Sequence, residues 1–84
     1  MNPISKLSDD HIAVLLDLWG MIDLQNPMIH LRSLDWSVDT HHLGLVEKSN
    51  IVHDLTRSGI IVRSNMLIVL PKSTLDNINK FLFE

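Results

Sequence analysis

The 84-residue chain contains no cysteine, which excludes disulfide bonds and thiolate sites and weakly favours a cytoplasmic protein. Long apolar runs are missing as well. The two longest, at 12–22 and 59–70, carry polar residues and fall well short of the ~20 residues that a helix needs to span a bilayer. The first ten residues lack the apolar segment of a signal peptide. We therefore expect a cytoplasmic protein without a membrane partner.

Basic residues are scarce. Seven Lys and Arg stand against ten Asp and Glu, for a net charge of −3 and a pI of about 5.9, whereas a nucleic-acid-binding domain is more often basic. The chain is also apolar for its size, at 45% hydrophobic, which predicts an exposed apolar patch and hence a homo-oligomer or a protein partner. We expect residues 1–84 to form one domain with a modest core. Length alone leaves open whether the chain is a fragment of a longer protein.

The first regular element is expected to be a helix. Ser8 is a candidate N-cap, and Asp9 and Asp10 follow where the helix dipole favours negative charge. Asn26-Pro27 closes the segment, because the residue before a proline is disfavoured in helical conformation. Apolar residues between these limits recur at three- and four-residue spacing over a broad face, which is typical of a central or dimer-forming helix. The expected buried face is Ile12, Leu15, Leu16, Trp19 and Ile22, broadened by Val14, Leu18 and Met21.

The middle of the chain allows more than one interpretation. Apolar and polar residues alternate from Met28 to Leu34, which fits a short edge strand and an extended linker equally well. Ser37 or Asp39 can then cap a second helix that runs through 40–43.

A further helix is expected to end near Gly59, where a left-handed C-terminal residue is favoured. Our preferred interpretation places a turn at 44–48 and a short helix over 50–57, capped by Ser49. The alternative is one longer helix that tolerates Gly44. In the later helix the buried stripe is Ile51, Val52 and Leu55, while Lys48, Asn50, His53 and Arg57 lie mainly on other faces.

A β-hairpin and a closing helix complete the chain. The β-branched runs at 60–62 and 66–70 predict two strands, with the bend at 63–65. Ser73, with Asp76 three residues later, resembles a capping box at the start of the last helix. The apolar positions of that helix are Leu75, Ile78, Phe81 and Leu82.

The run LTRSGIIVRSNMLIVLPKSTLDNI, residues 55–78, resembles the end of many bacterial winged helix-turn-helix domains. In those domains a recognition helix ends in Leu-x-x-x-Gly-Ile/Leu-Ile, a hairpin called the wing follows, and a further helix often packs behind it. The resemblance implies an α+β fold, a small winged-helix-like domain of three to four helices with a two-stranded β-hairpin wing. The matching positions are Leu55, Gly59, Ile60 and Ile61, within a resemblance that covers 43–80.

The same resemblance implies a small DNA-binding module for transcription regulation, dimeric through its first or last helix. The helix before Gly59 would enter the major groove, where Asn pairs with adenine and Arg with guanine, and the wing would contact phosphate or the minor groove. Glu47 and Asp54 oppose this interpretation, because phosphate repels carboxylates, and the alternative is an ordinary solvated face. The candidate DNA-binding residues are Lys48, Asn50, His53, Arg57, Arg63 and Asn65.

The alternative function is a winged helix used for protein–protein interaction, as a subunit, adaptor or antitoxin-like partner that does not bind DNA. The acidic pI favours it. Tryptophan is enriched at interface hot spots, although Trp36 can equally be a core residue. The candidate interface residues are Leu18, Met21, Trp36 and Phe81.

Catalytic and metal chemistry are not expected. Five histidines are present, but His41 and His42 are adjacent and point in different directions, and no cysteine can complete a zinc site. The sequence shows no glycine-rich phosphate loop, no nucleophile elbow and no Ser/His/Asp set at a known spacing. We expect no enzyme activity, no metal and no cofactor.

Overall fold

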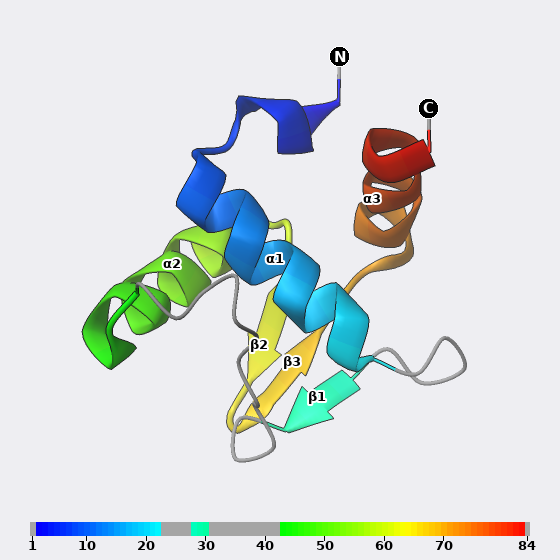
Figure 1. The fold of residues 1–84 in the computed structure, drawn as a ribbon. Helices are drawn as coiled ribbons and strands as arrows, with labels where there is room; N and C mark the ends of the chain where they lie inside the picture. The colour runs from blue at the N-terminus through cyan, green and yellow to red at the C-terminus, as the bar shows by residue number, and fades with distance from the viewer. Residues whose placement is uncertain (1, 23–27, 31–42, 84) are drawn as a thin grey trace.

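The computed structural model describes residues 2–22, 28–30 and 43–83, which form an α+β fold (Figure 1). Helix α1 lies across the centre of the molecule, with α2 and α3 on opposite sides of it in this view. The predicted α+β class is confirmed. The elements of the described residues are a 3-10 helix η1 (Pro3–Lys6), helices α1 (Asp9–Met21), α2 (Leu45–Arg57) and α3 (Lys72–Phe83), and strands β1 (Met28–His30), β2 (Val62–Ser64) and β3 (Leu67–Val69).

Helix α1 begins where the sequence predicts. The Ser8 hydroxyl oxygen accepts the amide hydrogen of His11 at 3.2 Å, so Ser8 is the N-cap. The helix ends at Met21, because Ile22 already has extended backbone angles. The fully buried residues are Val14, Leu15 and Leu18, while Ile12, Leu16, Trp19 and Ile22 are only partly buried.

The predicted members of this face all contact the core, but the centre of burial lies about one residue step around the helix from the predicted centre. Apolar residues surround most of α1, so periodicity could not decide which side the rest of the chain would cover. Leu18 has no exposed surface, and its prediction as an interface residue is wrong, because it packs in the core of this protein.

Over the described residues the sheet has three strands, in the order β1-β3-β2, and both pairs are antiparallel. This corrects the expected two-stranded hairpin, because β1 pairs with β3 and aligns Ile29 with Ile68. Of the two interpretations of the segment that begins at Met28, the edge strand is confirmed over Met28–His30. The predicted remainder, 31–34, lies outside the described residues.

The hairpin is shifted along the chain from its predicted position. The amides of Ile60 and Ile61 both donate to the Leu55 carbonyl, at 3.1 and 3.3 Å. They close α2 instead of joining the sheet, so β2 begins only at Val62. The two-residue turn begins at Asn65, whose φ of 54° is a left-handed conformation that asparagine tolerates.

Helix α2 starts earlier than expected. Gly44 is its N-cap residue, and the Gly44 amide donates to the carboxylate of Glu47 in the first turn. The helix then runs unbroken to Arg57, so neither the turn over 44–48 nor the cap at Ser49 is present. Gly59 has a φ of 79°, which confirms the left-handed residue expected after this helix. The helix predicted over 40–43 falls largely outside the described residues, as do its candidate caps at 37 and 39.

Helix α3 begins directly after Pro71, whose carbonyl accepts the Leu75 amide at 3.0 Å. Ser73 lies inside the helix, so the predicted capping box is wrong. Hydrogen bonds from the described residues also join α3 to the rest of the protein. The Thr74 hydroxyl donates to the Ile60 carbonyl, and the Asn2 side-chain amide donates to the Asn77 carbonyl at 2.7 Å.

Every helix and strand except β2 contributes to one core, and the sheet turns one side toward it. Antiparallel register places the buried Ile29 and Ile68 on that side. The opposite side, which we call the outer face of the sheet, leaves Met28, Val62 and Leu67 exposed by 44%, 49% and 37%. The buried apolar residues are Ile4, Val14, Leu15, Leu18, Ile29, Ile51, Val52, Leu55, Ile61, Ile68, Leu70 and Ile78.

Candidate nucleic-acid interface

Helix α2 displays a straight row of exposed side chains, which we call the outer ridge. Its members are spaced by four, three and four residues, so they align along one line of the helix surface. Ile51, Val52 and Leu55 lie on the opposite side and are buried. The outer ridge consists of Val46, Asn50, His53 and Arg57, all of which are exposed. Three of the predicted DNA-binding residues are therefore brought together on one surface.

Lys48 does not join them. It is only 8% exposed, because it precedes Ile51 by three residues and Leu55 by seven and so belongs to the buried stripe. The prediction that Lys48 faces away from the core is wrong. The error follows from the misplaced start of α2, since a helix that begins at Leu45 carries Lys48 into the regular period of its buried side. Burial leaves little of the lysine surface for a phosphate contact.

Arg63, in the middle of β2, and Asn65, in the turn of the β2–β3 hairpin, form a second exposed polar group, which we call the hairpin tip. The Arg63 Nε donates to the Asn65 carbonyl at 3.2 Å, which positions the guanidinium beside the turn. The two wing residues predicted from the sequence thus lie together. The hairpin follows α2 after four residues, 58–61, so the outer ridge and this tip belong to consecutive elements of the chain.

The two carboxylates of α2 are both engaged within the protein. Glu47 accepts the Gly44 amide at the start of the helix. Asp54 Oδ2 lies 3.0 Å from His11 Nε2 on α1, in an exposed pair that joins the two helices. These interactions give each carboxylate a donor that offsets part of its repulsion of an incoming phosphate.

The His11–Asp54 pair extends to a third residue. Ser8 Oγ lies 2.5 Å from His11 Nδ1, so Ser8, His11 and Asp54 form a continuous hydrogen-bonded chain of the residue types found in nucleophilic triads. Sequence reasoning missed this chain because 43 residues separate His11 from Asp54. As N-cap of α1, the Ser8 oxygen already accepts the amide hydrogen of His11. The contacts of His11 with Ser8 and with Asp54 both lie at the protein surface. We interpret the chain as a tie between the start of α1 and α2.

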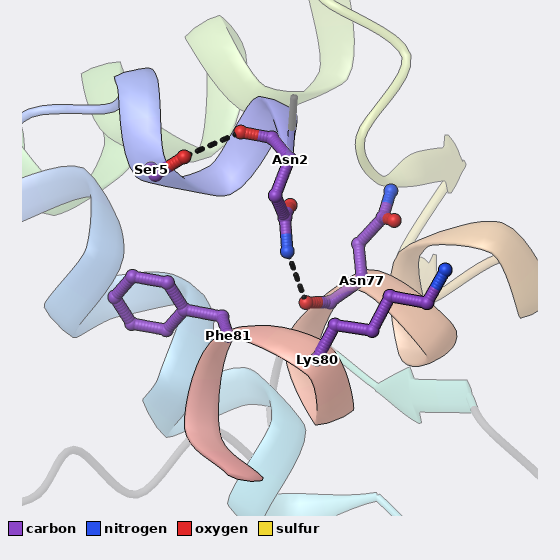
Figure 2. A pocket seen from close by; sticks show the side chains of 5 residues that line it. All are labelled: Asn2, Ser5, Asn77, Lys80 and Phe81. Carbon is purple, nitrogen blue, oxygen red and sulfur yellow. Dashed lines mark hydrogen bonds between the residues drawn. The ribbon is translucent and has the colours of Figure 1, made fainter. Parts of the chain in front are cut away.

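A hollow lies between η1 and α3, and its lining residues come from the two ends of the described chain, not from α2 (Figure 2). Across it, the Asn2 side chain reaches the Asn77 carbonyl, and the Ser5 hydroxyl donates to the Asn2 carbonyl at 2.6 Å. Lys80 and Phe81 complete the lining. Its polar contacts are made between its own residues, which is the pattern of a packed junction between the two ends of the chain.

The predicted interface residues that the structure describes differ in exposure. Phe81 is 38% exposed near the end of α3, where Leu82 and Phe83 are exposed by 39% and 74%. Met21 is partly buried against the core, in contrast to these residues. Trp36 lies outside the described residues.

Comparison with known proteins does not assign the chain to a family. Searches against protein-family models, curated proteins and solved structures gave no match. Within residues 2–22, 28–30 and 43–83, no three His, Asp or Glu side chains converge as a metal site. None of the helices over those same ranges combines the length and apolarity required to cross a membrane. The resemblance to winged helix-turn-helix domains remains a prediction, and the function has to be inferred from the residues themselves.

Proposed function

We propose that this chain is a small DNA-binding module for transcription regulation in the cytoplasm, dimeric, and of the winged-helix type. Helix α2 would enter the major groove through its outer ridge, and the β2–β3 hairpin would contact the sugar-phosphate backbone. The observation that carries the proposal is the alignment of Asn50, His53 and Arg57 on one exposed line of α2, directly before a hairpin that presents Arg63.

The chemistry of these side chains suits base and phosphate recognition. The major groove is about 12 Å wide and admits one α-helix. An asparagine can donate to and accept from adenine together, while an arginine can bind guanine or phosphate through two parallel hydrogen bonds. Asn50 lies toward the middle of the outer ridge and Arg57 at its C-terminal end, so a base contact flanked by a phosphate contact is a natural arrangement.

The net charge of −3 opposes DNA binding. Total charge does not set the local field, however, because exposed charges more than a Debye length apart are largely screened. On α2 the two carboxylates have partners within the protein, at Gly44 and His11. The exposed guanidinium groups of Arg57 and Arg63 are then the groups best placed to meet phosphate.

A salt series on random-sequence duplex DNA tests the proposal. Each phosphate contact contributes roughly 0.9 to the slope of log affinity against log salt concentration. We expect the wild-type protein to lose affinity as salt rises, and Arg57→Ala and Arg63→Ala each to reduce the slope by about 0.9. Lys80→Ala is the matched control, because Lys80 is also exposed but lies on α3, at the far side of α1 (Figure 1).

Two results would contradict the proposal. Absence of binding at the lowest salt concentration would remove the electrostatic contribution on which it depends. An equal loss of slope in Lys80→Ala would show that charge anywhere on the protein matters, and that α2 and the hairpin are not the contact surface.

The second candidate is a protein-interaction module that does not bind DNA. It is favoured by the exposed apolar end of α3, where Phe83 is 74% exposed beside Phe81 and Leu82. If this end joins two copies of the chain, Phe83→Ser should convert the oligomer to monomer in sedimentation equilibrium. An oligomer that binds no DNA at low salt and dissociates in this variant would favour the second candidate.

A further inference from the structure

Val46 is the apolar member of the outer ridge. It lies at the second position of α2, and 72% of its surface is exposed, a fraction that only Phe83 exceeds among the exposed large apolar residues described. The buried apolar stripe of the helix lies on the opposite side and consists of Ile51, Val52 and Leu55. Packing in the core therefore does not explain a branched apolar side chain at this position.

Its neighbour on the outer ridge is Asn50. Side chains four residues apart on a helix lie side by side, with Cβ atoms roughly 5–6 Å apart. Successive base pairs of duplex DNA are about 3.4 Å apart along the axis. Val46 and Asn50 would consequently reach base pairs one or two steps from each other when α2 lies in the major groove.

We propose that Val46 reads the C5-methyl group of a thymine, one or two base pairs from an adenine that Asn50 reads. Thymine is the only base that presents a methyl group in the major groove, and apolar side chains recognise it by direct contact. The amide of Asn50 supplies the donor and acceptor that adenine requires. This inference rests on the proposed DNA-binding function and adds to it the sequence preference of the site.

Position on the helix supports the assignment. The N-terminal residues of a recognition helix are the ones that commonly contact base edges, and Val46 lies in the first turn of α2. His53 and Arg57 follow one and two turns after Asn50 on the same line. The apolar contact and the adenine contact therefore belong to the N-terminal half of the outer ridge, and the basic contact to its C-terminal end.

Uracil is the sharpest probe, since it differs from thymine only by the missing methyl group. A duplex would first be selected from a random-sequence library with the full chain and then resynthesised with uracil at each thymine in turn. Loss of one apolar methyl contact should weaken binding of the wild-type protein about fourfold. We expect that penalty at one thymine, within two base pairs of a required adenine.

The variant Val46→Ala should bind the thymine and uracil duplexes equally, because its side chain is too short to reach the methyl group. Alanine is also the better helix former, so α2 should persist, and its circular dichroism spectrum checks this. Met28→Ala is the control. Met28 is likewise an exposed apolar residue, but it lies on β1, outside α2 and the β2–β3 hairpin, and this variant should retain the fourfold penalty.

The outcomes separate the inference from the function on which it rests. Salt-dependent binding with no uracil penalty, or a selection that recovers no preferred sequence, would overturn the role of Val46 and leave the DNA-binding proposal standing. A penalty that persists in Val46→Ala would assign the methyl contact to another residue and overturn the role as well. Failure to bind any duplex at low salt would overturn both.

Discussion

Two of the exposed glycines, Gly20 and Gly59, allow one substitution to be tested in two backbone conformations. A Cβ atom at either position would meet no atom within 4 Å, so steric contact is the same in both. Gly20 lies in the last turn of α1, whereas Gly59 has a φ of 79°. Alanine should therefore stabilise the protein at Gly20 and destabilise it at Gly59.

The expected magnitudes follow from backbone energetics. In helical conformation, alanine is favoured over glycine by roughly 0.5–1 kcal/mol. The left-handed conformation costs an L-residue about 1–2 kcal/mol, offset by about 0.4–1 kcal/mol from the smaller entropy of the unfolded chain. We expect Gly59→Ala to lose about 1 kcal/mol. In a domain of this size, each kcal/mol shifts Tm by roughly 4–8 °C, so the melting temperatures of the two variants should differ by about 10 °C.

Thermal unfolding followed by circular dichroism measures this difference directly. Gly59→Asn is the control, and its Tm should lie between that of the wild type and that of Gly59→Ala, because asparagine tolerates the left-handed conformation. If Gly59→Ala melts at or above the wild-type temperature, the left-handed ending of α2 is refuted. The position of the hairpin would then have to be revised, since this ending turns the chain from α2 into β2.

Two further predictions concern the core and its junction with α3. Leu55 is fully buried, so Leu55→Ala should cost about 2–5 kcal/mol in urea unfolding, a large part of the roughly 4–13 kcal/mol expected for a domain of this length. Leu67→Ala, at an exposed site, should cost much less, and equal losses would contradict the assigned core. Thr74→Val removes the hydroxyl that donates to the Ile60 carbonyl and should cost about 1 kcal/mol. Thr74→Ser retains that donor, so a loss in Thr74→Ser as large as in Thr74→Val would show that the hydrogen bond does not contribute.

Two predictions from local backbone chemistry are confirmed. Ser8 caps α1 because a side-chain oxygen satisfies an amide that the helix leaves unpaired. Gly59 has the left-handed conformation expected after α2. Each of these signals involves residues close in sequence, so no distant part of the chain had to be known.

Other local predictions are wrong, because a competing hydrogen bond forms within a few residues. The start of α2 was misplaced because the Glu47 carboxylate supports Gly44 as N-cap, although glycine has no capping side chain of its own. The hairpin was placed too early because the backbone of Ile60 and Ile61 closes α2. β-branched residues favour strands, but the amides of these two were already engaged.

In the candidate site, some features follow from local spacing and others depend on contacts between distant segments. Asn50, His53 and Arg57 could be predicted to share a surface, since their spacing places them on one side of any helix that spans them. The burial of Lys48 could not be predicted in the same way, because this burial depends on where α2 begins. The approach of His11 to Asp54 is a contact between two helices, and local sequence carries no signal for it.

The sequence by itself determined the α+β class, the capped start of α1, the left-handed ending of α2 and the row of polar residues along that helix. These features follow from hydrogen bonds and periodicities that repeat within a few residues. Only the tertiary structure decided which side of α1 is buried, that β1 completes a three-stranded sheet, and that Val46 rather than Lys48 belongs to the outer ridge. Burial is a property of the whole packed chain, and an apolar pattern on several sides of a helix fits more than one packing.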